Sequence, residues 1–421
     1  MKKSTFLGLP YWQVVLGVVF LSQMLTAVGF SMVFPFLPLY VEDLGSTHGL
    51  SVEVMAGLVI SAQGLTMMIA APIWGAVADR YGRKLMIMRA MFGGAILSAM
   101  MGMVSSGEQL IFLRGVQGIV TGTVAANNAL IAATVPREKI GFAMGTLQVG
   151  LWGGVALGPL LGGVMADMYG YAMPFYITGF LLFLSGILIY FGIHENFDSE
   201  KAKNDAERRL GLMAQWQHVM SANGVSMVYM MRFLAGVGRS LIIPITPLFI
   251  LSLLPPDAAN TSIFTGSVMA VSSATATISG IYLGRLGDRI GHRIVLMWAS
   301  IAVVAFYIPQ VFVVNVWQLL GLQALAGFAM GGIIAAPSAL LARYTEPGEE
   351  GAVYGLDNSI VAGARAIAPL AGAGIALWFG LRGTFAATAL LFVIVAVASV
   401  LFLPDDSLKT RQQLQPSAAG D

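Results

Sequence analysis

A ten-residue stretch occurs twice in this chain and divides it into two related halves. Residues 75–84 read GAVADRYGRK and residues 284–293 read GRLGDRIGHR, so that an Asp-Arg pair and two glycines recur in the same register, 209 positions apart. The same interval carries the prolines of VFPFLPLY onto those of LIIPITPLF, and it becomes 210 between Pro159 and Pro369. An internal repeat of this length indicates two structural units of one topology.

Long apolar runs fill both halves of the repeat. Hydrophobic residues make up 57% of the chain and charged residues only 10%, whereas soluble domains carry roughly a quarter charged residues. The runs reach the length of about 20 residues that a membrane-spanning helix needs. We predict an all-α polytopic membrane protein with twelve transmembrane helices in two pseudo-symmetric six-helix bundles, at about residues 11–41, 53–78, 84–105, 108–134, 140–168, 171–194, 222–254, 261–285, 293–314, 317–343, 350–379 and 382–403.

The distribution of basic residues predicts the orientation in the membrane. Eighteen of the 23 Lys and Arg residues lie at or near the termini or alternate links, and the opposite links hold only Arg382. The positive-inside rule then places both termini in the cytoplasm, with the chain in the cell inner membrane. Lys2 and Lys3 precede no small-residue cleavage site, so we expect an uncleaved start. The predicted parts are an N-terminal bundle at 1–193, a cytoplasmic linker at 194–219, a C-terminal bundle at 220–403 and a cytoplasmic tail at 404–421.

Several classes of function are disfavoured by what the sequence lacks. It has no cysteine, and its four histidines lie in links or near span ends without a metal-like cluster. The motifs GxSxG, HExxH and the Walker phosphate loop do not occur, so we predict neither an enzyme nor a cofactor. A net charge of +2 gives no indication of nucleic-acid binding. A channel would need a filter or a ring of like side chains, which the sequence does not show.

The repeated loop carries more than positive-inside anchors. Anchoring accounts for Arg80 and Lys84, but it does not explain why Gly75 and Asp79 recur at fixed spacing. A carboxylate at a helix end can accept hydrogen bonds from the free N–H groups of a neighbouring helix start. We predict a gate that consists of Gly75, Asp79, Arg80, Gly82 and Arg83, their second-half counterparts Gly284, Asp288 and Arg289, and Asp357 as a partner for Arg83.

Polar residues follow one helix face on three of the apolar spans. An ionisable side chain that faces lipid is costly, so these faces should meet protein or water. Hydrogen bonds that hold helices together are the simpler alternative to a role in a cavity or in coupling. Asn127 points away from its stripe and is predicted to be a helix contact, and Arg232 lies near an inner end and is predicted to snorkel. The buried polar candidates are Arg114, Gln117, Thr121 and Asn128 in the fourth span, Arg239 in the seventh, and Asn358 and Arg365 in the eleventh.

Small residues follow one face of the fifth span. Glycines recur at every fourth position from Gly150 to Gly162, a spacing that lets two helix backbones approach closely. Pro159 removes a hydrogen-bond donor and favours a bend. Packing is the simplest explanation, and we further predict that Gly150, Gly154, Gly158, Pro159 and Gly162 contact a helix of the other half. Candidates to line a cavity are Gln23, Phe30, Phe34, Gln148 and Trp152.

These motifs resemble those of the major facilitator superfamily. The two loops resemble its motif after the second and eighth helices, and LRGVQG at 113–118 resembles its fourth-helix motif with a buried Arg. GLWGGVALGPLLGG at 150–163 resembles the fifth-helix motif of drug-proton antiporters. GFSMVFPFLPLYVEDLG at 29–45 resembles MdtG-like bacterial multidrug exporters. The resemblance implies that the loops latch the two halves on the inner side.

The resemblance also implies a function, which is multidrug efflux by proton antiport with alternating access, and therefore antibiotic resistance. The expected partners are small-molecule substrates, protons and membrane lipid, with the proton gradient as driving force and a monomer as the assembly. A metabolite, sugar or lipid transporter on the same fold is the alternative. The first span lacks the buried acid of many such antiporters, so the sequence names no proton carrier. Arg239 and Arg365 have no carboxylate at their level, which favours anionic or zwitterionic amphiphilic cargo.

Overall fold

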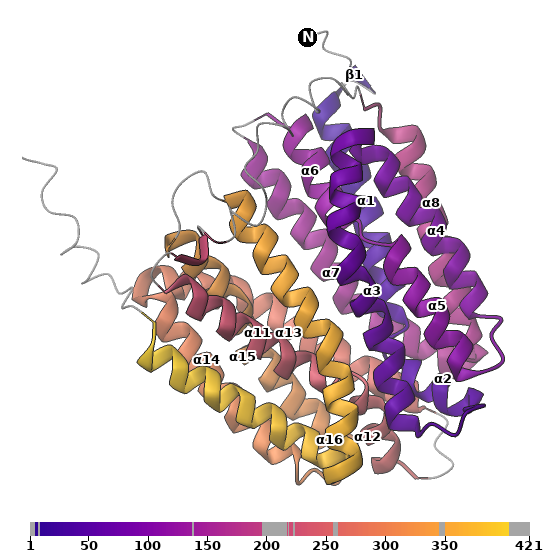
Figure 1. Cartoon of the computed structure of the whole chain (residues 1–421), viewed down its shortest axis with the longest axis vertical. Coiled ribbons are helices and arrows are strands. Elements are labelled where there is room, and N and C mark those ends of the chain that lie inside the picture. The colour runs from indigo at the N-terminus through magenta and orange to yellow at the C-terminus, as the bar shows by residue number, and fades with distance from the viewer. Residues whose placement is uncertain are drawn as a thin grey trace, which may run out of the picture. The chain divides into compact units, whose positions relative to one another are not determined.

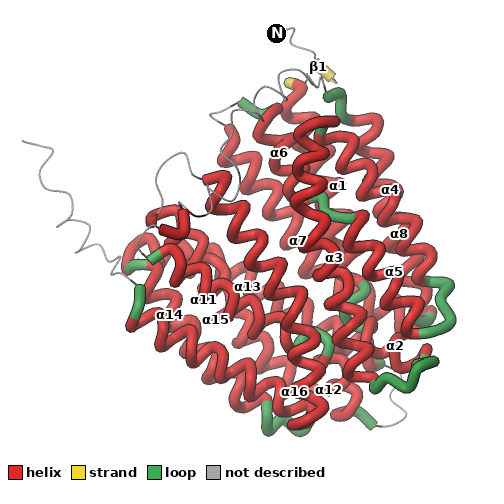
Figure 2. Tube along the Cα trace, viewed as in Figure 1, coloured by secondary structure: helices red, strands yellow, loops and turns green. Residues whose placement is uncertain are grey.

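A computed structural model describes residues 5–6, 9–136, 139–195, 217, 219–221, 224–255, 260–344 and 350–403. These residues are almost entirely helical, as the red tube of Figure 2 shows. Ten helices of the described part are long and apolar enough to cross a membrane. The predicted tail and most of the predicted linker lie outside the described residues.

The chain divides into two compact units, and Figure 1 labels their elements. Unit 1 is residues 1–209 with 255–270, and unit 2 is residues 210–254 with 271–421. Helix α13 (Thr261–Ile290) begins in unit 1 and ends in unit 2. Unit 1 also holds the antiparallel strands β1 (Thr5–Phe6) and β2 (Leu9–Pro10) and the helices α1 (Tyr11–Met32), α2 (Leu37–Leu44), α3 (Val52–Tyr81), α4 (Arg83–Met101), α5 (Gly107–Val120), α6 (Val124–Thr134), α7 (Ile140–Tyr169) and α8 (Ala172–Gly192). Unit 2 holds α11 (Val225–Leu241), α12 (Ile245–Leu253), α14 (His292–Gln310), α15 (Val316–Tyr344) and α16 (Glu350–Leu401).

Three predicted spans are each interrupted in the structure. The first divides into α1 and α2 around Pro35, and the seventh divides into α11 and α12 just before Pro244. The fourth divides into α5 and α6, because Gly122 has a φ of 127° and the two threonines that flank it are not helical. Arg114 and Asn128 therefore lie on different helices, and the predicted continuous stripe of the fourth span is wrong.

Helix α16 joins the last two predicted spans into 52 residues. A straight helix of that length would measure about 78 Å, well beyond a hydrocarbon core of about 30 Å. The backbone turns at Gly380, whose φ of 72° is readily adopted only by a residue without a side chain. The structure thus supports the predicted all-helical class, while the count of twelve spans stays a prediction.

Glycines bring α7 and α1 into backbone contact. A Cβ atom built on Gly162 would lie 1.9 Å from the carbonyl oxygen of Met32, and one built on Gly158 would lie 1.9 Å from the Ser31 hydroxyl. The same arrangement recurs in unit 2, where a Cβ on Gly372 of α16 would lie 2.1 Å from the Leu241 carbonyl of α11. The glycines spaced by four contact α1 of their own half, so the predicted contact with the other half is wrong for them.

Substitution of these glycines should separate tight packing from simple helix propensity. We expect Gly162→Ala to lower the stability by about 1–3 kcal/mol, because the new methyl group meets a backbone carbonyl that cannot rotate away. Gly153→Ala on the same helix is the matched control, since no atom lies within 4 Å of its Cβ position. Thermal unfolding in detergent measures both variants, and equal melting temperatures would contradict this packing.

Candidate functional site

Arg114 joins three helices in the interior of unit 1. Its side chain is only 1% exposed. The Nε atom donates to the Val59 carbonyl of α3 at 3.3 Å, and Nη1 donates to Oε1 of Gln117 at 2.9 Å. Gln117 in turn donates to the Ser98 hydroxyl of α4 at 3.3 Å. These contacts match the simpler prediction for this residue, in which the guanidinium holds helices together through hydrogen bonds.

A neutral node joins α1, α6 and α7. Gln23 donates to the Leu147 carbonyl at 3.0 Å, and Asn127 donates to Oε1 of Gln23 at 3.0 Å. Asn127 is fully buried, which confirms it as a helix contact. Gln23 is 2% exposed, so its side chain is part of the interior of unit 1 and the prediction that it lines a cavity is wrong. The other candidates have exposed or half-buried side chains, namely Phe30, Phe34, Gln148 and Trp152.

An ion pair takes the place of this neutral node in unit 2. Arg232 occupies the position of Gln23 in the repeat, 209 residues later, and Asp357 occupies that of Leu147 at the interval of 210. Two guanidinium nitrogens of Arg232 donate to the two carboxylate oxygens of Asp357, at 3.0 and 3.1 Å, and its Nη1 donates to the Ile334 carbonyl at 2.9 Å. Arg232 therefore binds inside the protein and does not snorkel. The predicted pairing of Asp357 with Arg83 of unit 1 stays a prediction.

Three arginines of unit 2 lie within electrostatic range of one another. The charges of Arg365 and Arg232 act electrostatically on the Arg239 guanidinium, and so does the Tyr307 hydroxyl of α14. Tyr307 stands at the repeat position of Ser98, and Gln323, which donates to Gln310 at 3.0 Å, stands at that of Arg114. The two halves thus keep polar residues at matching positions, but the charge lies on α5 in unit 1 and on α11 and α16 in unit 2.

Asp357 is the one buried carboxylate among the described residues, with 6% exposure. Arg232 matches its charge in bidentate geometry, which is the strongest form of this contact. Arg365 is exposed on the surface of α16. The described part of unit 2 therefore holds more buried or half-buried positive than negative charge around α11 and α16. The side chain of Asn358, next to Asp357, lies outside the described residues.

The gate loops are described only in part. The side chains of Asp79 and Arg80 lie outside the described residues, as does the surrounding of Gly75. Gly82 and Gly291 make the turns after α3 and α13 with φ values of 95° and 103°. Asp288 contacts His292 at 3.2 Å, and both Arg289 and Asp288 are exposed, whereas Gly284 is half-buried. The latch between the halves stays a prediction.

A carboxylate that the sequence analysis missed holds the start of α4. Glu195 accepts hydrogen bonds from the backbone N–H groups of Arg83 and Lys84, at 3.1 and 2.7 Å. The Nζ atom of Lys84 donates to the carbonyls of Tyr190 and Ile193, at the end of α8. This is the helix-start interaction that was predicted for Asp79, made by a different acid. The position of Glu195 directly after an apolar span was the sequence signal that could have indicated this contact.

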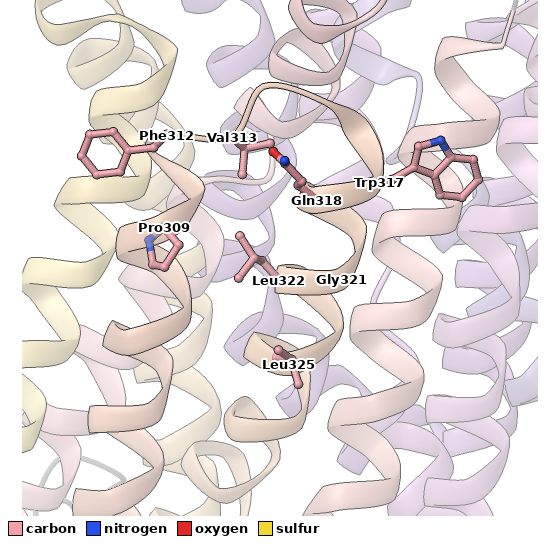
Figure 3. A pocket seen from close by; sticks show the side chains of 8 residues that line it. All are labelled: Pro309, Phe312, Val313, Trp317, Gln318, Gly321, Leu322 and Leu325. Carbon is pink, nitrogen blue, oxygen red and sulfur yellow. The ribbon is translucent and has the colours of Figure 1, made fainter.

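A shallow pocket of about 420 Å³ lies at the turn between α14 and α15, shown in Figure 3. Its walls are mostly apolar, and Phe312 and Trp317 are 74% and 69% exposed. Exposed aromatic rings near a span end are typical of the membrane interface. This pocket has no charged lining, and the candidate site is therefore the polar interior of α11, α14, α15 and α16.

The ion pair of unit 2 predicts a particular pattern of stabilities. We expect Arg232→Met to cost about 3–5 kcal/mol, because it leaves the Asp357 carboxylate buried and without its cation. The double variant Arg232→Met/Asp357→Leu should recover most of that loss, since neither charge remains. Thermal unfolding of the wild type, both single variants and the double variant measures the coupling. Additive losses would contradict a direct pair.

Arg114 predicts a contrast between two substitutions. Arg114→Lys keeps the charge but cannot reach both the Val59 carbonyl and Gln117 from one ammonium nitrogen in the same geometry. We expect transport to fall at least about tenfold for Arg114→Lys and to be lost for Arg114→Ala. Transport per correctly folded molecule is the measurement. Wild-type transport by the lysine variant would mean that charge alone matters.

The arrangement is that of a multi-pass membrane transporter built from two repeats, and comparison with known proteins shows the family. The family model described as Major Facilitator Superfamily matches residues 19–231 and 228–418. Together these matches cover nearly the whole chain. The chain therefore belongs to the major facilitator superfamily.

Its relatives include curated multidrug resistance proteins. The chain is 37% identical to "Multidrug resistance protein MdtG" of Salmonella dublin over 380 residues, which is 90% of this chain and 92% of the relative. It is 35% identical to the protein of the same name from Dickeya zeae, over 93% of this chain and 95% of the relative.

Solved structures of low identity share the fold. A bacterial homologue of the human lysosomal transporter Spinster, inward-facing and occupied, superposes with a TM-score of 0.79 at 14% identity, over 98% of this chain and all of the other. The human organic anion transporter MFSD10 gives 0.67 at 21% identity, over 93% of this chain and all of the other.

Proposed function

We propose that this protein exports chemically varied small molecules from the cell. The observation that carries the proposal is the 37% identity to MdtG multidrug resistance proteins over nine-tenths of both chains. Identity over that length includes both repeats, so the relatives share the complete scaffold and not only one motif. In this proposal both termini face the cytoplasm, as the distribution of basic residues predicts.

The transport cycle is proposed to be alternating access driven by the proton gradient. The interrupted spans support such movement, because the breaks at Gly122 and before Pro244 leave backbone groups that can change partners. The sequence contains no phosphate-binding loop that would power transport by a nucleotide. Asp357 is the acid of the described interior that a proton could reach when its pair with Arg232 opens.

Charge in unit 2 supports a preference for anionic or zwitterionic amphiphiles. Arg232 binds the Asp357 carboxylate through two nitrogens, so this acid is already engaged. Arg239 is half-buried and lies within electrostatic range of Arg232 and Arg365, and positive charges gathered around α11 and α16 favour an anion nearby. A permanent cation would meet repulsion at the same place. The proposed substrate preference therefore depends on the pairing of the Asp357 carboxylate with Arg232, and not only on the number of arginines.

Resistance assays with matched compounds test this preference. In cells without their own exporters, we expect the protein to protect more strongly against anionic amphiphiles than against lipophilic quaternary ammonium dyes. Arg365→Ala and Arg239→Ala should each reduce protection against the anions about tenfold and leave any dye export unchanged. Strong dye export that persists in both variants, without protection against anions, would contradict the charge argument.

Proteoliposomes with an imposed pH gradient test the function itself. Uptake of panel compounds that rises with the gradient and stops when it is collapsed is the expected result. Arg285→Gln is a matched control, since it removes an exposed arginine of α13 that is not one of the three arginines proposed to select the substrate. Transport of a single sugar, metabolite or lipid, with none of the amphiphiles, would instead favour the alternative function.

A further inference from the structure

The start of α13 is held inside unit 1 by one carboxylate. Oδ1 of Asp167, near the end of α7, accepts from the backbone N–H of Ser262 at 3.2 Å, and Oδ2 accepts from that of Ile263 at 2.7 Å. These are two of the first N–H groups of the helix, which have no partner within the helix itself. A negative charge there is also favoured by the helix dipole.

The backbones of α7 and α13 meet at the same place. A Cβ atom on Gly163 would lie 2.2 Å from the Ser262 carbonyl oxygen, and one on Gly266 would lie 2.2 Å from the carbonyl oxygen of Pro159. Ser262 is fully buried and Thr261 is 7% exposed. The contact therefore combines two glycine-mediated backbone approaches with a two-point carboxylate cap, and we call these residues the α13 clasp.

The clasp is not a consequence of the repeat. Asp167 corresponds to Leu377 in the second half at the interval of 210, and Leu377 is 49% exposed. The second half therefore has no carboxylate at the position that corresponds to Asp167. Residues 261–270 of α13 belong to unit 1 and the rest of the helix belongs to unit 2. A movement that draws the start of α13 away from α7 would have to break this cap.

We propose that Asp167 is a gate residue of transport, whose charged carboxylate holds the α13 clasp closed and whose protonation opens it. A carboxylate offers acceptors on both oxygens, whereas a protonated carboxyl group carries its hydrogen on one of them and has no charge for the dipole to stabilise. The clasp is therefore strongest when Asp167 is charged and weakens as the pH falls. The inference rests on the proposed function, which places this end of α7 on the outer side, where protons enter.

Other titratable groups lie around the α13 clasp. Tyr171, at the start of α8, lies within electrostatic range of the carboxylates of Asp167, Asp43 and Glu42. Burial, and next the charge of Glu53, raise the pKa of Glu42 above its usual value. Tyr40 lies within electrostatic range of Asp43 and Tyr176, and His48 contacts Glu108 at the same end of unit 1.

Labelling of a single cysteine tests the clasp, because the chain has no cysteine of its own. Ser262→Cys places a thiol of similar size at the buried contact, and Thr261→Cys is a second reporter if the first variant folds poorly. A membrane-impermeant maleimide is added from outside. We expect slow labelling in the otherwise unchanged protein. With Asp167→Asn the labelling rate should rise about tenfold, because the loss of one helix-capping interaction changes an equilibrium by about that factor.

The controls separate the clasp from general effects. Asn260→Cys, at an exposed position two residues earlier, corrects for the ionisation of the thiol itself. Relative to that reporter, labelling at Ser262→Cys should rise in acid for the wild type and for Asp167→Glu, and should be independent of pH for Asp167→Asn. Asp43→Asn, which removes an exposed acid at the same end, should change nothing.

The possible outcomes are distinct. A labelling rate that depends on neither pH nor Asp167 would overturn the clasp. A faster rate in Asp167→Asn, together with transport that keeps its wild-type dependence on outer pH, would overturn the gate and leave a structural cap. If the clasp opens in acid but no compound of the panel is exported, the inference about Asp167 holds and the proposed export function fails.

Discussion

The absence of water from a bilayer core is the constraint on which the rest of this structure depends. Every polar group must find a partner inside the protein, so helices dominate and each interruption needs local compensation. The Gln23 node, the Arg114 node and the pair of Arg232 with Asp357 all meet this demand by joining helices. The interior polar residues are therefore structural first, and any role in transport must act through contacts that are already engaged.

Close packing through glycine sets which helices can carry such nodes. Gly158 and Gly162 bring α7 onto α1, and Gly372 brings α16 onto α11, so the two halves use one solution for the same pair of helices. The Gln23 node and the pair of Arg232 with Asp357 lie along these same helix pairs. Because the backbone packing is shared, Arg232 in place of Gln23 and Asp357 in place of Leu147 turn a neutral node into an ion pair on the corresponding helices. The repeat thus provides one scaffold and two electrostatic environments.

The asymmetry between the halves suggests where function was added to the repeat. Unit 1 has the fully buried guanidinium of Arg114 on α5, whereas unit 2 has guanidiniums on α11 and α16 with one buried carboxylate among the described residues. The carboxylate cap on α13 also lacks a counterpart, since Leu377 stands in place of Asp167. Substrate charge, proton coupling and gating would then depend on the positions at which the two copies differ.

The sequence by itself determined the class, the repeat and the helix contact of Asn127, because apolar length and periodicity depend only on local composition. It also indicated that Gly150–Gly162 would pack closely, but not on which helix. Only the tertiary structure decided that partner, and likewise that Arg232 binds Asp357 and that Glu195 and Asp167 hold helix starts. Each of these contacts joins residues that are from about 95 to 130 positions apart, and spacing within one helix carries no information about side chains on another.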